Sequence, residues 1–190
     1  MNKIHFSMLV FALGLFLGAC NNSDDPKKQA DAVNKDMKTI DNDDSQFMTE
    51  ATSGGMMEVA AGKIAVQRGI SKEVKDFGQQ MIEDHSKAND ELKGLAMQKN
   101  VTIPADLSND DQKNIDKLNA ATDKEFDKTY MDMMVDDHKK DVDAFQKVVD
   151  NPKDADVKIW AEKTLPTLKH HLEMARMDQS VVDKYHKEMK

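Results

Sequence analysis

Two stretches of the chain repeat one pattern, in which a methionine is followed by an apolar residue, two acidic residues and a histidine. The pattern runs from Met81 to His85 and again from Met134 to His138. Each methionine precedes its histidine by four residues, so both side chains share one face of an α-helix. Imidazole and thioether groups together suit copper, above all Cu(I). The repeat therefore predicts a metal site built from at least two helices.

The apolar faces of four predicted helices each carry one polar residue with ligand chemistry: Glu58, His85, His138 and His171. Burying an unpaired carboxylate or imidazole costs several kcal/mol, so we expect the four to meet in one interior. Glu58 lies 11 residues before Gly69, where the first helix should end. His85 lies 14 residues after Ser71, where the second should begin, so the two differ in depth by about 4–5 Å.

The elements that must position these residues are helical patterns over about 45–68, 72–98, 109–149 and 155–176, with a break in the third near 120–123. Pro166 lies inside the fourth and should kink it. Methionine is frequent, at 14, and aromatic residues make up only 5%. Short loops favour antiparallel neighbours, so we predict an all-α antiparallel four-helix bundle over 44–178. The runner-up is an extended helical hairpin that dimerises.

The N-terminus resembles the signal peptide of a bacterial lipoprotein. Lys3 precedes an apolar run over 8–17 that is too short to span a bilayer comfortably. Leu17 to Cys20 resembles a lipobox, which implies cleavage after residue 19 and acylation of Cys20, the only cysteine. The alternative is a secretory peptide with an incidental cysteine. We expect a signal peptide over 1–19, the lipidated Cys20 with a flexible tether over 20–43, and a frayed helical tail over 179–190.

The net charge of the chain excludes some classes of binding partner. The net charge of -8 argues against nucleic acid and against electrostatic attachment to anionic lipid. Membrane attachment is therefore expected through acyl chains on Cys20. Asn21 after this cysteine favours the outer membrane of a bacterial envelope, on its periplasmic or surface face.

Several motifs together resemble the domain of unknown function 4142 family of bacterial envelope proteins. They cover about 46–175 and read GGMMEVAAGKIA, EVKDFGQQMIEDHSKANDELKGLA, IPADL, EFDKTYMDMMVDDH and LPTLKHHLEMA. The resemblance implies a ferritin-like bundle and no established reaction. It places the family's recurrent polar positions on Glu58, Asp84, His85, His138 and His171.

Metal-free interpretations stay open beside this one. Met81 and Met134 could be core filler, and the Glu58 and histidine cluster could be a hydrogen-bonded polar network. Adjacent residues on a helix point about 100° apart, so Asp84 and Asp137 are expected to pair elsewhere, for example with Lys87 or Lys140. His170 and His186 are expected at the surface.

Three functions follow from these interpretations. The favoured one is sequestration of a transition metal, with copper preferred over zinc or iron. The second is a structural or interaction lipoprotein that is not an enzyme. The third, an oxidase or peroxidase, is weakest because a di-iron site needs several carboxylates and Glu-x-x-His pairs. The residues three before the candidate histidines are Ile82, Val135 and Leu168.

Overall fold

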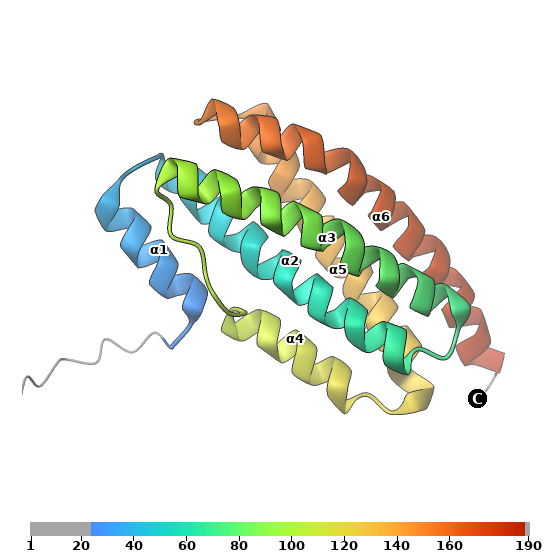
Figure 1. Ribbon diagram of the computed structural model, residues 1–190. Coiled ribbons are helices and arrows are strands. Elements are labelled where there is room, and N and C mark those ends of the chain that lie inside the picture. Colours follow the sequence, from blue (N-terminus) through green and yellow to red (C-terminus); the bar gives the residue numbers. More distant parts are fainter. Residues whose placement is uncertain (1–23, 189–190) are drawn as a thin grey trace, which may run out of the picture.

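The computed structural model describes residues 24–188, which form six α-helices and no strand (Figure 1). The all-α prediction is confirmed. The signal peptide predicted over 1–19 and the predicted lipidation site Cys20 lie outside the described residues. Within the described part, no helix has both the length and the apolar character needed to cross a membrane. The helices are α1 (Pro26–Met37), α2 (Asn42–Arg68), α3 (Lys72–Lys99), α4 (Asn109–Ala120), α5 (Asp123–Asp150) and α6 (Ala155–Glu188).

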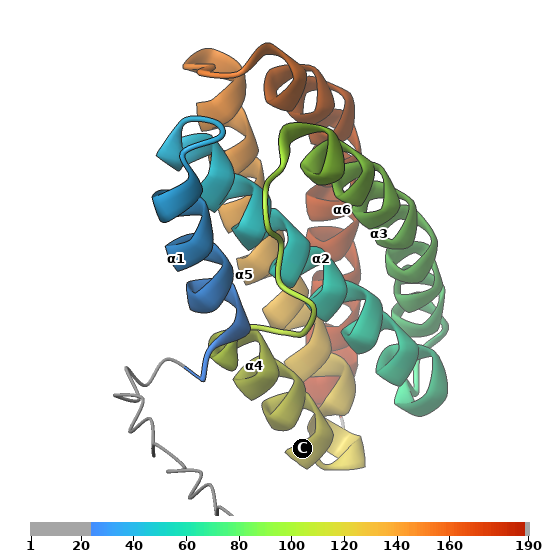
Figure 2. The same ribbon diagram turned by 60° about the vertical axis from the view of Figure 1, so that its left-hand side comes forward.

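The four long helices form two hairpins that lie side by side. A short turn joins α2 to α3, and another joins α5 to α6. The hairpins pack on each other through α2 against α5 and α3 against α6, while the short helices α1 and α4 lie against α2 (Figures 1 and 2). The prediction named four helices, and the described chain has six.

Local sequence sets most helix ends. Ser71 caps α3 by accepting a hydrogen bond from the backbone N–H of Val74, and Ser108 caps α4 in the same way through Asp111. The expected break in the third pattern separates α4 from α5 at residues 121–122. Helix α6 continues through Pro166 as one element.

Small residues let α2 and α3 approach closely. A Cβ atom on Gly62 would lie 2.6 Å from the carbonyl oxygen of Gly78, and one on Gly78 would lie 2.9 Å from the oxygen of Gly62. Because glycine has no side chain, the two backbones can come this close at these positions. This contact is one turn from Glu58, so it fixes the distance between the helices near the candidate site.

Two terminal segments differ from expectation. Helix α1 lies inside the stretch predicted as a flexible tether. Asp25 caps it, and Asn34 holds it through hydrogen bonds to the backbone N–H and carbonyl of Thr102 at 2.7 and 2.8 Å. Of the helical tail predicted over 179–190, the described residues up to 188 belong to α6. The difference there is His186, which is buried rather than at the surface, with its Nε2 atom 3.5 Å from Glu125 Oε2.

Two hydrophobic clusters fill the interior. One gathers around Phe77, Met81, Phe126, Tyr130 and Met134, and the other around Phe47, Leu92, Phe145, Trp160 and Leu168. Along each long helix, one of the candidate ligands lies between residues of the first cluster and residues of the second. The sequence therefore places a polar layer between two apolar ones.

Candidate metal centre

Three histidines from three helices form a triangle in the interior. The ring centroids of His85, His138 and His171 are 5.3 to 5.5 Å apart. One ring nitrogen of each lies within 4.8 Å of the others. Their exposed fractions are 5%, 0% and 0%, and Glu58 beside them is 1% exposed. The structure thus brings together the four side chains that helical spacing had aligned.

Each imidazole is held by one of its two nitrogens. His85 Nδ1 lies 2.6 Å from Glu58 Oε2, and His171 Nε2 lies 2.8 Å from Asp84 Oδ2. His138 Nδ1 lies 3.0 Å from the carbonyl oxygen of Met134, which can only accept, so this nitrogen carries the proton. Partners of this kind orient the rings of metal-binding histidines and leave the other nitrogen free to bind.

The opposite nitrogens have no hydrogen-bond partner although they are buried: His85 Nε2, His138 Nε2 and His171 Nδ1. Buried polar atoms are rarely left in this state, because each loses its contacts with water. When the held nitrogen of each ring carries the ring proton, the three opposite nitrogens are acceptors, and one water molecule, which donates only two hydrogen bonds, cannot satisfy all of them. One metal ion can accept all three lone pairs, and the residues present therefore fit a metal.

Burial keeps the three rings neutral. Desolvation lowers the pKa of His85 to about 4. Desolvation, and then repulsion from the other two rings, lowers the pKa of His138 to about 3. Desolvation also lowers the pKa of His171 to about 4, against the opposing effect of its bond to Asp84. At neutral pH all three rings keep the lone pair that a metal requires.

Glu58 also belongs to a group of three acids, in which it is buried and the other two are partly exposed. One carboxylate oxygen each of Glu58, Asp137 and Asp141 lies within 4.8 Å of the other two. Desolvation, followed by repulsion from neighbouring acids, raises the pKa of Glu58 well above its usual range and that of Asp137 to about 6. The shifted pKa values favour the uncharged forms of Glu58 and His85, so their short contact is a hydrogen bond rather than an ion pair. A bound cation would favour the ionised carboxylate, with His85 Nδ1–H donating to it.

The remaining sequence candidates surround this core. Met81 and Met134 are fully buried in the first hydrophobic cluster, one turn before His85 and His138. His170 is exposed, as expected. Asp84 pairs with His171 on α6 and not with Lys87, which corrects the expectation from its sequence neighbours.

Sequence reasoning missed two acids. Asp141 lies three residues after His138 and four before Phe145, so helical spacing could have placed it on the buried face. Asp137 was expected to find a lysine, but within the described residues it forms no ion pair, and its Oδ2 atom is buried without a hydrogen-bond partner. Its position beside a core-facing histidine gave no signal for this placement.

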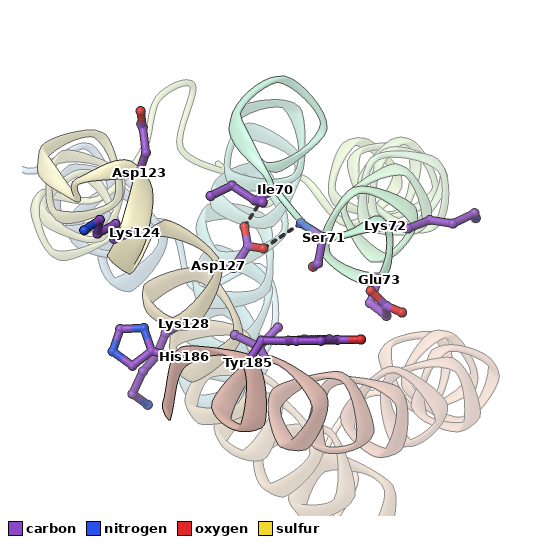
Figure 3. A pocket seen from close by; sticks show the side chains of 11 residues that line it. Ile70, Ser71, Lys72, Glu73, Asp123, Lys124, Asp127, Lys128, Tyr185 and His186 are labelled. Carbon is purple, nitrogen blue, oxygen red and sulfur yellow. Dashed lines mark hydrogen bonds between the residues drawn. The ribbon is translucent and has the colours of Figure 1, made fainter. Parts of the chain in front are cut away.

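A further hollow with mostly apolar walls lies elsewhere in the described structure. A cavity of about 350 Å³ opens at the end of the helices where α2 turns into α3, and its lining includes Ile70, Lys128, Val182 and Tyr185 (Figure 3). Asp127 is part of its lining and accepts hydrogen bonds from the backbone N–H groups of Ile70 and Ser71. None of its lining residues belongs to the histidine triangle or to the acidic group.

Comparisons with known proteins agree with the fold. The family described as "Domain of unknown function (DUF4142)" matches residues 28–177. Among curated proteins, none matches the chain. The crystal structure of a DUF305 fragment from Deinococcus radiodurans is similar with a TM-score of 0.64 and 10% identity, over 76% of this chain and 98% of that one. The structure of "CopM in the Cu(I)-bound form" is similar with a TM-score of 0.60 and 17% identity, over 70% and 93%.

Proposed function

From the premise that this chain belongs to the domain of unknown function 4142 family, we propose that it is an envelope lipoprotein that sequesters a transition metal. We describe its fold as a ferritin-like four-helix bundle, made of α2, α3, α5 and α6, to which α1 and α4 are added. His85, His138 and His171 bind the metal through their unpartnered nitrogens. Glu58 orients His85 and is close enough to supply a fourth ligand atom.

The observation that carries this proposal is the meeting of three buried imidazoles, one nitrogen of each within 4.8 Å of the others, in which every ring has one held and one partnerless nitrogen. A metal-free polar network is the alternative. It accounts for the bonds of the rings to Glu58, Met134 and Asp84 but leaves His85 Nε2 and His171 Nδ1 without a partner. The unsatisfied atoms favour the metal.

Copper is the favoured ion. Imidazole nitrogens bind copper, zinc and iron, so the rings alone do not select among them. Two observations favour copper: the buried thioethers of Met81 and Met134, which we propose as additional soft ligands, and the similarity in fold to a protein whose solved form binds Cu(I). Zinc and iron are the less favoured alternatives.

The test is metal analysis of the full-length chain in detergent after incubation with Cu(I), Zn²⁺ or Fe²⁺ and removal of the excess. We expect one tightly bound copper ion per chain, retained against the other two metals. The His85→Ala/His138→Ala variant should lose it, while His170→Ala, which removes an exposed imidazole from α6, should keep it. Equal copper in the wild-type protein and the double variant would refute the proposed site.

The proposed location rests on Cys20 and is tested separately. Cells fed labelled palmitate should incorporate label into the wild-type chain and into Asn22→Ser, which leaves the lipobox intact. Cys20→Ser should carry no label and should leave the membrane fraction. Asn21→Asp is expected to move the protein from the outer to the inner membrane. A labelled Cys20→Ser chain would contradict the lipoprotein assignment.

A further inference from the structure

Next to the histidine triangle, one buried acid and two partly exposed acids lie close together. Asp137 and Asp141 lie one turn apart on α5, and Glu58 faces them from α2. One oxygen of each lies within 4.8 Å of the others. Three carboxyl groups thus share one small region, which reaches from the interior toward the surface.

No lysine or arginine within residues 24–188 forms an ion pair with Glu58, Asp137 or Asp141. Lys140 favours the ionised forms of Asp137 and Asp141 only from a longer distance, and the pKa values of both acids are raised despite it. Three like charges in one small region oppose folding unless a cation or protons neutralise them. Full ionisation of the group therefore calls for a bound cation.

A contact between Glu58 and His138 shows where positive charge is needed. His138 is completely buried, and its Nε2 atom lies 3.3 Å from Glu58 Oε1. Neither atom has a hydrogen-bond partner. Because the ring proton is on Nδ1, a lone pair on nitrogen faces the carboxyl oxygen, and this approach is favourable when Oε1 carries a proton or when a positive ion attracts both atoms.

The region also has room. A cavity of about 20 Å³ lies beside Glu58, His85 and Asp141, and it extends toward Gly55 and Asn89. A volume of this order holds one water-sized particle. The Oδ2 atom of Asp137, which belongs to the same group of acids, is buried and has no hydrogen-bond partner.

We propose that Glu58, Asp137 and Asp141 form a second cation site, which takes a hard divalent ion such as Mn²⁺, Mg²⁺ or Ca²⁺ through oxygen ligands. Carboxylate oxygens prefer such ions, whereas the imidazoles and thioethers next to them prefer softer ones. The two sites meet at Glu58. Its Oε2 atom lies next to His85, and one of its oxygens belongs to the group of three acids. The inference goes beyond the proposed function, because it holds whether or not copper fills the histidine triangle.

The test uses Mn²⁺ as the probe and electron paramagnetic resonance as the readout, on the full-length chain in detergent. Cu(I) is silent in this measurement and is added first, so that it occupies the histidines. We expect one bound Mn²⁺ per chain, displaced by excess Mg²⁺ or Ca²⁺. Wild-type protein that binds no Mn²⁺ would overturn the proposal and would show that protons neutralise the acids.

Matched variants separate the two sites. Asp137→Asn/Asp141→Asn should lose Mn²⁺ and keep Cu(I), and the loss of repulsion should leave the variant folded by circular dichroism. Asp136→Asn/Asp143→Asn removes the same charge from exposed positions of α5 and should keep both ions. Mn²⁺ binding that survives in the first variant would overturn the proposal. If Mn²⁺ binds but Cu(I) does not, the second site stands and the copper function falls.

Discussion

Two layers of the interior are built by the same four helices and differ in how they are satisfied. In the apolar layer, Phe47, Leu92, Phe145 and Trp160 come from α2, α3, α5 and α6 in turn. In the polar layer, Glu58, His85, His138 and His171 come from the same helices in the same order. The comparison shows that packing alone almost fully satisfies the buried side chains of the apolar layer but not those of the polar layer.

The apolar layer is nearly complete in itself. The ring of Phe145 lies 4.8 Å from that of Phe47 and 5.2 Å from that of Trp160, at angles typical of favourable aromatic contacts. Only the indole nitrogen of Trp160 is buried without a partner. The polar layer leaves three imidazole nitrogens and a carboxylate oxygen unsatisfied. Its stability should therefore depend on an ion, while that of the apolar layer should not.

The largest effect is expected in the apolar layer. Phe145→Ala should lower the free energy of unfolding by about 3–5 kcal/mol, because a buried ring is replaced by a cavity. Denaturant unfolding should give the same loss with and without copper. Ile159→Ala, at a position 61% exposed, is the control and should change stability by less than about 0.5 kcal/mol. A Phe145→Ala loss that appears only in the metal-loaded protein would remove the distinction between the layers.

Removing an acid beside the polar layer should have the opposite effect and raise the free energy of unfolding. The pKa of Asp137 is raised from 3.8 to about 6, so this group destabilises the metal-free fold fully above pH 6 and not below pH 3.8. In the presence of chelator, Asp137→Asn should therefore stabilise the protein by roughly 1–3 kcal/mol at pH 7.5 and by almost nothing at pH 3.5.

The comparison with wild type at each pH isolates this effect. The three histidines have lowered pKa values, about 3 for His138 and about 4 for the other two, so their contribution to stability rises with pH and is complete above about pH 6.5. At pH 7.5 all three rings are neutral in both proteins, so the difference there reports the carboxyl group. Asp136→Asn, at an exposed position, is the matched control. An Asp137→Asn protein that is less stable than wild type at pH 7.5 would mean that the carboxylate is compensated in the fold.

Loss of a residue that orients a histidine of the polar layer should have a smaller effect, and this effect is on copper affinity. Asp84→Ala removes the acceptor that holds His171 Nε2 at 2.8 Å. Copper affinity should fall about 10–100-fold, as is usual when the partner of a ligating histidine is lost. Competition with a Cu(I) chelator measures this change, and Asp90→Ala, at an exposed position on the same helix, should leave affinity unaltered. Unchanged affinity in Asp84→Ala would mean that His171 does not bind the metal.

The smallest effect concerns the spacing between α2 and α3. A Cβ on Gly54 would meet nothing within 4 Å, so Gly54→Ala should stabilise α2 by about 0.4–1 kcal/mol. Gly62→Ala should instead destabilise the protein, since its Cβ would lie 2.6 Å from the oxygen of Gly78. Thermal unfolding compares the two, and equal shifts would show that the helices do not approach as closely as described.

Sequence periodicity predicted the helices and the inward faces well because it depends only on local spacing. The positions of Glu58, His85, His138 and His171 follow from residues three and four apart on amphipathic helices. Asp84 was not predictable in this way, because its partner is 87 residues away on α6. Helix α1 was missed because its sequence has few large apolar residues, and its attachment depends on the bonds between Asn34 and Thr102, 68 residues apart. The resemblance to the domain of unknown function 4142 family is confirmed.

The most direct measurement of the central claim is X-ray absorption at the copper edge of the full-length, Cu(I)-loaded protein. Three imidazoles lie together in the described structure, with one nitrogen of each within 4.8 Å of the others, so the spectrum should contain scattering from three imidazole rings per copper ion. In His138→Ala, it should fall to two rings. A spectrum without imidazole scattering, or a chain that takes up no metal, would contradict the account.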